Sequence, residues 1–306
     1  MSERLIRVLR WGVGLLILAF VIIQVRRNWN ELQSQSITWT FRPLPALASV
    51  VVVWAMYGLL IEAWRRMLAG WSQRLAPGPA ARIWVLSSLG KYIPGKVWAI
   101  AGMALMAREA GVAPWAAMAS AVLLQALAVG TGAVISVLFG GALLRVERPE
   151  LVLWFWVGGA GALLGVLALL VPPVTRRLLA LARLDPGTAA PGTGPILIGA
   201  AANLVAWIGY GVAFRLLALA LLPDAAPALG AGIAAFAASY VAGLVFLVAP
   251  GGLLVREGLL FAMLHGSIGA GPAAGLAVAS RVLLTITELG AAVPFLILRW
   301  GKPSAA

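Results

Sequence analysis

Two long apolar segments of this chain are each interrupted by proline, glycine and charged residues, a combination suited to binding an anion inside a membrane. The first interruption has Lys91 and Lys96 on either side of Pro94 and Gly95. Pro94 lacks the amide hydrogen that a helix needs and Gly95 imposes no helical bias, so the pair predicts a helix break. Two ammonium groups beside the free backbone amides of a broken helix would attract a phosphate. The alternative is that both lysines extend to the membrane surface and bind nothing.

The second interruption lies late in the chain, where Pro250, Gly251 and Gly252 precede an adjacent Arg256 and Glu257. Broken backbone at membrane depth persists only where protein or a water-filled cavity covers it. Ionisable side chains at that depth are costly and are usually functional. Because neighbours on a helix point about 100° apart, this Arg and Glu are not expected to pair with each other.

The last apolar segment supplies the partners that we expect for Arg256 and Glu257. Arg281 and Glu288 are seven residues apart there and share one helical face. Two interpretations stay open. The four side chains either form a buried ion network that only ties helices together, or they bind a headgroup and exchange a proton when the substrate displaces a charge partner.

The composition indicates a polytopic membrane protein. Hydrophobic residues make up 62% of the 306 residues and charged residues 11%, whereas soluble proteins have about 45–50% and about 25%. We expect one membrane domain over residues 1–306, with halves of roughly 1–185 and 195–306 joined by a Gly/Pro/Thr-rich linker. The net charge of +13 lies mostly between apolar segments, so we assign it to membrane topology rather than to nucleic acid. With no cysteine and one histidine, no metal or other cofactor is expected.

The apolar segments predict an all-α fold of about six full spans plus two re-entrant or broken helical hairpins. Neither arm of the first broken segment has the ~20 residues needed to cross, so we favour a re-entrant hairpin over one kinked span. The excess of Lys and Arg in alternate loops predicts cytoplasmic N- and C-termini. The full spans are expected at residues 11–25, 45–61, 114–144, 151–171, 196–222 and 272–298.

The two breaks indicate an internal repeat. Pro94 and Pro250 are 156 residues apart, and each precedes a short apolar arm, a Gly/Pro loop and an Ala-rich helix. On the expected path those two helices run in opposite directions, which is the inverted topology of many secondary transporters.

A few other residues receive structural interpretations. Asn203 is expected to hydrogen-bond across helices, and Arg215 is expected to extend to the membrane surface. Gly161 and Gly165 form a small-residue packing face, either within one chain or between chains. His265 stands alone near a segment end, and no role is assigned to it.

The motifs resemble those of a known family. Residues 89–96 (Leu-Gly-Lys-Tyr-Ile-Pro-Gly-Lys) and 108–112 (Arg-Glu-Ala-Gly-Val) resemble the first signature of the lysylphosphatidylglycerol synthase transmembrane-region family, also described as flippase-like. Residues 250–258 (Pro-Gly-Gly-Leu-Leu-Val-Arg-Glu-Gly) resemble its second signature, and Arg281 falls where that family tends to keep an arginine. The resemblance covers nearly the whole chain. It implies a multi-pass protein of the bacterial inner (plasma) membrane, linked to moving amphiphilic lipids between leaflets.

Two features depart from the family pattern. Gln125 stands where members often have an acid, and the soluble aminoacyl-transfer domain of the full-length synthases is absent, so lysyl transfer is not implied.

The function predicted is that of a flippase-like transporter, and not of an enzyme. It would move an anionic or lipid-linked amphiphile between leaflets through a polar cavity, while the tails stay in the bilayer. The substrate would be a membrane phospholipid or a polyprenyl-linked lipid, with no nucleic acid involved. A homodimer or a partner lipid-modifying enzyme stays open. The alternative is a non-transporting accessory subunit that presents lipid to a partner enzyme; a membrane-embedded transferase is the weakest interpretation. The residues expected to bind the substrate are Lys91, Pro94, Gly95, Lys96, Pro250, Gly251, Gly252, Arg256, Glu257, Arg281 and Glu288.

Overall fold

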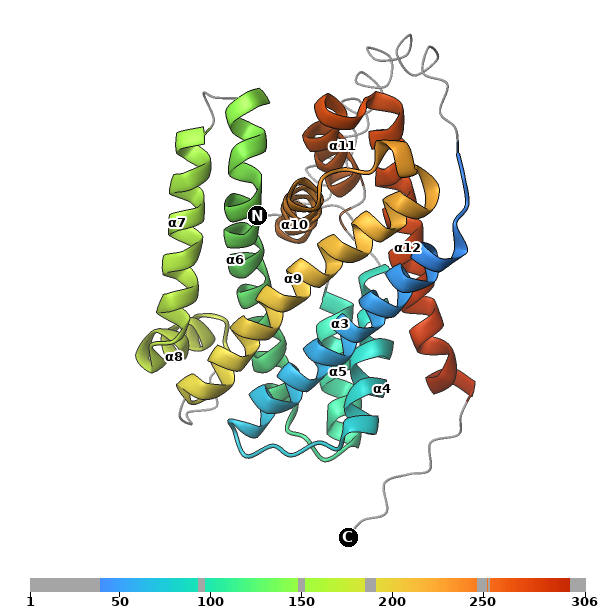
Figure 1. Ribbon diagram of the computed structural model, residues 1–306. Coiled ribbons are helices and arrows are strands. Elements are labelled where there is room, and N and C mark those ends of the chain that lie inside the picture. Colours follow the sequence, from blue (N-terminus) through green and yellow to red (C-terminus); the bar gives the residue numbers. More distant parts are fainter. Residues whose placement is uncertain are drawn as a thin grey trace, which may run out of the picture.

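The computed structural model describes residues 39–92, 97–147, 152–184, 191–246, 252 and 254–297. Every regular element in these ranges is helical, which confirms the all-α prediction (Figure 1). The elements are α3 (Pro43–Ala69), α4 (Pro77–Ser88), the 3-10 helix η1 (Leu89–Tyr92), α5 (Val97–Glu109), α6 (Pro114–Glu147), α7 (Val152–Leu169), α8 (Pro172–Leu181), α9 (Thr193–Leu221), the 3-10 helix η3 (Pro223–Ala225), α10 (Leu229–Val245), α11 (Val255–Ile268) and α12 (Ala270–Ile297).

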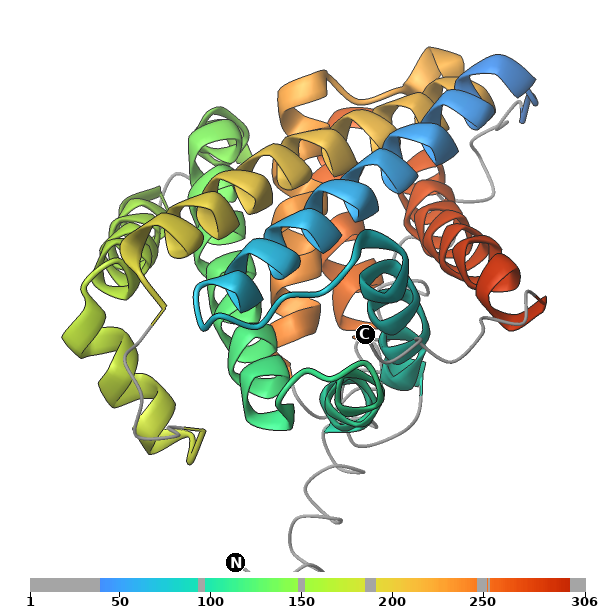
Figure 2. The ribbon, with the colours of Figure 1, turned by 90° about the horizontal axis from the view of Figure 1, so that it is seen from below.

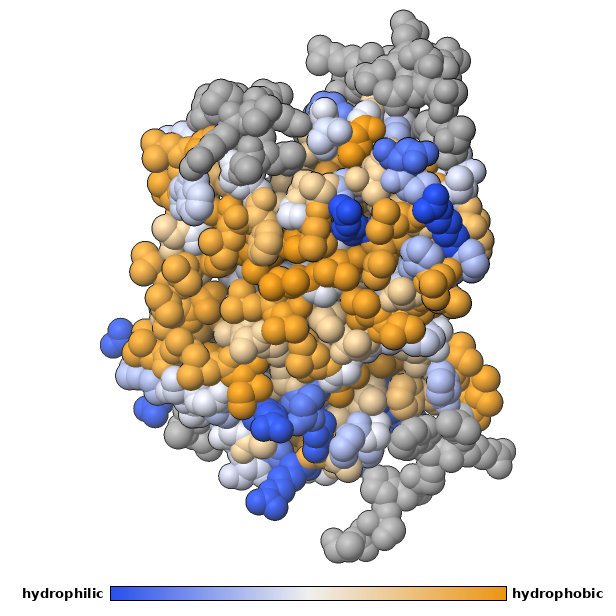
Figure 3. Space-filling model, in the orientation of Figure 1, coloured by the Kyte–Doolittle hydropathy of each residue, from blue (hydrophilic) through white to orange (hydrophobic). Residues whose placement is uncertain are grey.

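Five of the described helices, α3, α6, α7, α9 and α12, are long and apolar enough to cross a membrane. On the face shown in Figure 3, apolar side chains form a broad band across the middle of the molecule, and many polar side chains gather toward its two ends. The chain is therefore a multi-pass membrane protein. The sixth expected span, at residues 11–25, lies outside the described residues.

Proline marks where several helices start. Pro43, Pro77, Pro114 and Pro172 each occupy the first position of their helix. An amide hydrogen would have no intrahelical partner at that position, so its loss costs nothing there, and the fixed backbone angle of proline favours the helical turn. The same residue type that breaks a helix in its interior therefore sets helix boundaries in this chain.

The two halves repeat the same order of elements. The first has a long helix, a short helix, a break, a short helix and a long helix, as α3, α4, η1, α5 and α6. The second has α9, α10, a break, α11 and α12 in the same order. In both halves the two short helices pack on each other and the second of them packs on the following long helix.

The repeat is inverted. The backbone amide of Thr40 donates to Leu221 O at 3.0 Å, so the start of α3 lies beside the end of α9. At the other end, a Cβ added to Gly70 would lie 3.0 Å from Pro195, near the start of α9. The two helices are thus antiparallel neighbours, and both views show them crossing the molecule side by side (Figure 2). Helices α6 and α12 likewise run in opposite directions (Figure 1).

The short helices form two hairpins at opposite ends of the molecule. Helices α4 and α5 open toward the end where α3 finishes, and α11 joins α12 at the opposite end (Figure 1). Residues 93–96 and 247–251, which include the predicted breaks, lie outside the described residues. The described Gly252 has φ of +68°, and a Cβ there would be 2.8 Å from Gly243 Cα. Glycine at both positions lets the two arms of the second hairpin approach closely.

The interior does not divide between the halves. One buried apolar cluster includes Trp64 and Met67 from α3, Leu127 from α6 and Ile196 from α9. A second includes Val53 from α3 with residues of α6 and of α9 to α12. Because α3, α6 and α9 contribute to both clusters, the described helices pack as one unit.

One helix was not expected. Residues 172–193, between the spans predicted at 151–171 and 196–222, were expected to be an inter-span segment, but Pro172–Leu181 forms α8. One face is buried and the other carries charge: Thr175 and Leu179 are buried, whereas Arg176 and Arg177 are exposed. A ten-residue helix is too short to span a membrane and carries two adjacent arginines, so an argument from apolar length misses it.

Candidate functional site

A cavity of about 450 Å³ lies between the two hairpins. Every helix of both repeat units contributes described residues to its wall, whereas α7 and α8, which connect the units, contribute none. Five of the residues predicted to bind substrate line it, namely Lys91, Gly252, Arg256, Arg281 and Glu288. Glu257 lies behind the wall and contacts Arg281. The other five predicted residues, Pro94, Gly95, Lys96, Pro250 and Gly251, lie outside the described residues.

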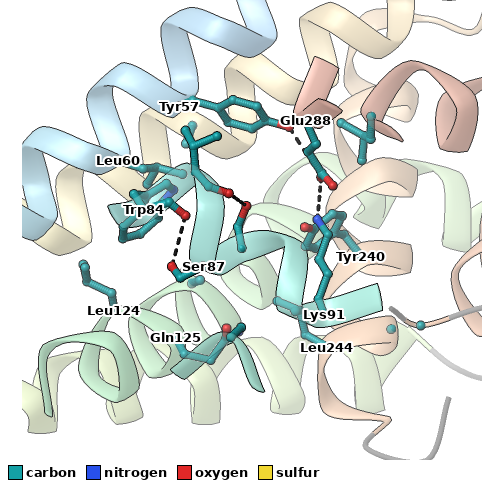
Figure 4. Close-up of a pocket in the computed structure, with 18 of the residues that line it drawn as sticks. Tyr57, Leu60, Trp84, Ser87, Lys91, Leu124, Gln125, Tyr240, Leu244 and Glu288 are labelled. Carbon is teal, nitrogen blue, oxygen red and sulfur yellow. Dashed lines mark hydrogen bonds and ion pairs between the residues drawn. The ribbon is translucent and has the colours of Figure 1, made fainter. Parts of the chain in front are cut away.

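The first hairpin presents Lys91 and Tyr92 to Glu288 of α12. Lys91 Nζ forms an ion pair with Glu288 Oε1 (Figure 4). Tyr92 OH donates to Glu288 Oε2 at 2.7 Å. Glu288 is 6% exposed, whereas Tyr92 is 39% exposed, so the contact extends from the interior to the rim of the cavity. This network fastens the tip of the first hairpin to α12.

The backbone at the hairpin tip explains why Lys91 reaches the cavity. Residues 89–92 form a 3-10 turn directly after α4, and this tighter turn redirects the chain toward α5. A Cβ added to Gly90 would lie 2.7 Å from the amide nitrogen of Ala99. The absence of a side chain at Gly90 therefore lets the turn fold back against α5, with Lys91 on the cavity side.

The second hairpin is fastened to α12 by another ion pair. Arg281 Nη1 donates to Glu257 Oε1 at 3.0 Å, which confirms a partner predicted from the sequence. The other carboxylate oxygen, Oε2, accepts a hydrogen bond of 2.8 Å from the amide of Leu254. Glu257 thus caps the start of α11 and orients Arg281 at once.

Among the described residues, Arg256 has no carboxylate partner. It is 4% exposed, its Nη2 donates to Ser280 Oγ at 3.2 Å, and no described residue accepts a hydrogen bond from its Nε. The guanidinium carbon lies 5.0 Å from the ring centre of Phe236 and 5.4 Å from that of Tyr240. Within the described residues no carboxylate comes within 4 Å of it. A buried charge without a counterion is costly, which makes this side chain suited to an anionic ligand.

The expected pairing of Arg256 was therefore wrong. We expected Arg281 or Glu288 to supply partners for both Arg256 and Glu257, but Glu288 is occupied by Lys91. Lys91 belongs to the other half of the chain, and no spacing rule predicts which half supplies a counterion.

All four tyrosines of the chain line the cavity, and the sequence prediction named none of them as a site residue. Tyr57 OH contacts Glu288 Oε1 at 3.5 Å and Thr287 Oγ1 at 3.4 Å. The rings of Tyr210 and Tyr240 pack edge-on against Trp207, with centroids 6.3 and 5.6 Å away. The sequence did contain an indication of their role, because every tyrosine falls within or beside a long apolar segment, where its hydroxyl needs a hydrogen-bond partner.

Two amides also line the wall. Gln125 faces the cavity from α6 (Figure 4). Asn203 was expected to bond across helices, but its amide donates to Gly199 O, one turn earlier in α9, at 2.8 Å. A short polar side chain can donate its hydrogen bond to a carbonyl four residues earlier in its own helix and then needs no partner on a neighbouring helix. The expectation was wrong for this reason.

Several other expected roles have outcomes in the described structure. Arg215 donates to Pro227 O in the loop before α10 and is not part of the cavity wall. His265 stacks on Phe261 of its own helix. A Cβ added to Gly161 or Gly165 would meet no atom within 4 Å, so this face of α7 packs against no other described helix.

The cavity and the ion pairs behind it hold three cations and two carboxylates, which leaves one positive charge over, and the remaining wall is mostly apolar. No cluster of three or more histidine, aspartate or glutamate side chains in the described residues is arranged to hold a metal ion. This arrangement can hold an anionic group at Arg256 while apolar chains stay outside.

No protein-family model, no curated protein and no solved structure matches this chain. The resemblance to the lysylphosphatidylglycerol synthase transmembrane-region family therefore stays a prediction that rests on the sequence motifs.

Proposed function

We propose that this protein moves an anionic amphiphile between the two leaflets of a membrane, with the headgroup in the cavity and the tails in lipid. The observation that carries the proposal is Arg256, a buried cation that faces the cavity and has, among the described residues, neither an acceptor for one N–H nor a carboxylate partner. A phosphate would supply both the missing charge and the missing acceptor.

The inverted hairpins support transport rather than static binding. They approach the cavity from opposite ends of the molecule, and each is fastened to α12 by one ion pair. If one pair opens at a time, the same cavity faces one leaflet and then the other, as in other transporters with inverted repeats. The chain contains no nucleotide-binding motif, so we propose movement that is either downhill or coupled to an ion gradient.

Exchange of counterions gives the substrate a way to act on the first hairpin. A phosphate bound at Arg256 would compete with Glu288 for Lys91, since all three side chains line one cavity. If Lys91 bound the phosphate in place of Glu288, the hairpin tip would no longer be held to α12. Substrate binding would then shift the equilibrium toward the state in which this contact is open, by an amount set by the difference in substrate affinity between the two states.

The test is leaflet-resolved translocation in proteoliposomes. Vesicles carry a trace of phosphoglycerol lipid labelled with a fluorophore on its acyl chain, and dithionite reduces only the label in the outer leaflet. We expect the purified protein to expose inner-leaflet label faster than protein-free vesicles do. Equal rates together with intact lipid binding would contradict transport and favour the accessory-subunit alternative.

A further inference from the structure

The polar groups of the cavity divide into those with partners and those without. Both carboxylates are engaged, because Glu288 binds Lys91 and Glu257 binds Arg281. Among the described residues, Arg256 Nε is buried without a hydrogen-bond partner. The hydroxyls of Tyr210 and Tyr240 and the side-chain amide of Gln125 also line the wall, are at least partly exposed, and form no hydrogen bond to a described residue.

The unpartnered groups comprise one cation and three neutral groups that both donate and accept hydrogen bonds. A phosphate would pair with the guanidinium of Arg256. The group esterified to that phosphate would lie beside the two tyrosine hydroxyls and the Gln125 amide, which hydrogen-bond well to substrate hydroxyls. A ligand without hydroxyls would displace water from these groups and replace none of its hydrogen bonds, which lowers its affinity, so the site favours a ligand that carries hydroxyls.

A cationic headgroup has no place in this wall. It would need a free carboxylate, and none of the described residues provides one to the cavity. Aromatic faces also bind ammonium groups, but Phe236 and Tyr240 already carry the guanidinium of Arg256. The excess positive charge of Lys91, Arg256 and Arg281 adds repulsion.

We propose that the cavity selects amphiphiles in which a phosphate is esterified to a neutral, hydroxyl-rich group, such as glycerol or a sugar, and rejects zwitterionic headgroups. This proposal rests on the proposed function, since it names the substrate class of the same site. The phosphate lies at Arg256, and the hydroxyls contact Gln125, Tyr210 and Tyr240. A cavity of about 450 Å³ suits a small headgroup, because pockets of roughly 300–1,000 Å³ hold drug-sized ligands.

The first arm of the test compares headgroups in the dithionite assay. Acyl-labelled lipids carry phosphoglycerol, phosphomethanol or phosphocholine; phosphomethanol has the charge of phosphoglycerol without its hydroxyls. We expect phosphoglycerol to move about tenfold faster than phosphomethanol, and phosphocholine to be slowest. A fluorescent polyprenyl phospho-monosaccharide, run in parallel, shows whether the shared chemistry comes from a glycerolipid or from a lipid-linked sugar. Equal rates for all headgroups would overturn the selectivity while leaving transport intact.

The second arm measures binding and stays informative if no lipid moves. Trp84 and Trp207 line the cavity, so their fluorescence reports occupancy in detergent-purified protein. Glycerol 3-phosphate is expected to quench it at about tenfold lower concentration than phosphocholine. If glycerol 3-phosphate binds more tightly than phosphocholine but no lipid is translocated, the proposed selectivity holds and the proposed transport function is wrong. Equal quenching, or a preference for phosphocholine, would overturn the selectivity.

Two variants of one side chain separate charge from hydrogen bonding. Gln125→Glu adds a carboxylate, so it is expected to slow phosphoglycerol lipid about tenfold and to narrow its advantage over phosphocholine lipid. Gln125→Leu removes the amide and is expected to equalise phosphoglycerol and phosphomethanol. Each variant is used only if its thermal unfolding in detergent matches that of the wild type. Unchanged headgroup ratios in both folded variants would overturn the proposal.

Discussion

At the residue scale, two adjacent side chains have separate roles because a helix points them apart. Glu257 caps α11 and pairs with Arg281, whereas Arg256 faces the cavity with an unpartnered N–H. The sequence predicted that the two would not pair with each other, and this is confirmed. It also predicted a partner for Glu257 correctly, since Arg281 lies on the one nearby helix that carries an opposite charge.

The Lys91–Glu288 pair gives a prediction about stability. Lys91→Met leaves Glu288, which is 6% exposed, without its counterion and is expected to destabilise the protein by about 2–4 kcal/mol. Glu288→Met should act similarly through the stranded ammonium group. The double variant is expected to be more stable than either single variant, because no unpaired charge remains. Thermal unfolding of the four proteins in one detergent measures this; additive losses would contradict a direct ion pair.

The tyrosines show the limit of prediction from residue types. Charged residues inside apolar segments are conspicuous because burying a charge is costly. A tyrosine in an apolar segment does not indicate a site in the same way, since tyrosine is common both at lipid-facing and at buried positions. Tyr57, Tyr210 and Tyr240 come from three helices. Only the packing of these helices brings their rings to one wall, and periodicity within a single segment carries no information about that.

At the element scale, the order of long and short helices was predicted, whereas α8 and the end of α3 were not. Pro-Gly pairs at both interruptions gave the order of arms and long helices that the repeat follows. The sequence did not predict α8, nor that α3 would extend to Ala69 past three charged residues. There Glu62 pairs with both Arg65 and Arg66, three and four residues on, so the charges stabilise the helix instead of ending it.

The close approach of Gly252 to Gly243 in the second hairpin predicts that replacing Gly252 costs far more stability than replacing a glycine elsewhere in the hairpin. Gly252→Ala forces a side chain onto a backbone with φ of +68° and brings its Cβ to 2.8 Å from Gly243 Cα. We expect a loss of about 1–3 kcal/mol of stability. Gly258→Ala is the matched control, since it lies in α11 with no atom within 4 Å of an added Cβ. The control should be neutral or stabilising by up to ~1 kcal/mol. Comparable unfolding temperatures for the two variants would show that the arms do not meet at Gly252.

At the scale of the whole molecule, the two halves are interleaved rather than separate. Helices α3 and α9 lie antiparallel along most of their length, and both buried clusters draw on both halves. A charge from each half is needed to complete the Lys91–Glu288 pair. The sequence predicted the repeat from its motifs, but interleaving depends on contacts between residues more than 100 positions apart, which no local pattern records.

Orientation in the membrane is a further prediction. The described loops at the end where α3 finishes carry arginines such as Arg74 and Arg183, and this favours the cytoplasmic side of a bacterial inner membrane. The chain has no cysteine, so single cysteines report access cleanly. Asp224→Cys, in the exposed η3 turn, should react with an impermeant maleimide in intact spheroplasts. Arg74→Cys should react only after lysis. The reverse pattern would contradict this orientation.

The measurement that tests the central claim most directly compares two arginines in the translocation assay. Arg256→Gln removes the cavity cation that has no carboxylate partner among the described residues, whereas Arg215→Gln removes an arginine that bonds a loop carbonyl outside the cavity wall. We predict that Arg256→Gln slows movement of phosphoglycerol lipid by about 10–100-fold, since a hydrogen bond to a charged group contributes about 1.5–3 kcal/mol. Arg215→Gln, matched for folding, should stay close to the wild-type rate. If Arg256→Gln moves lipid as fast as Arg215→Gln, Arg256 does not hold the headgroup and the account is wrong.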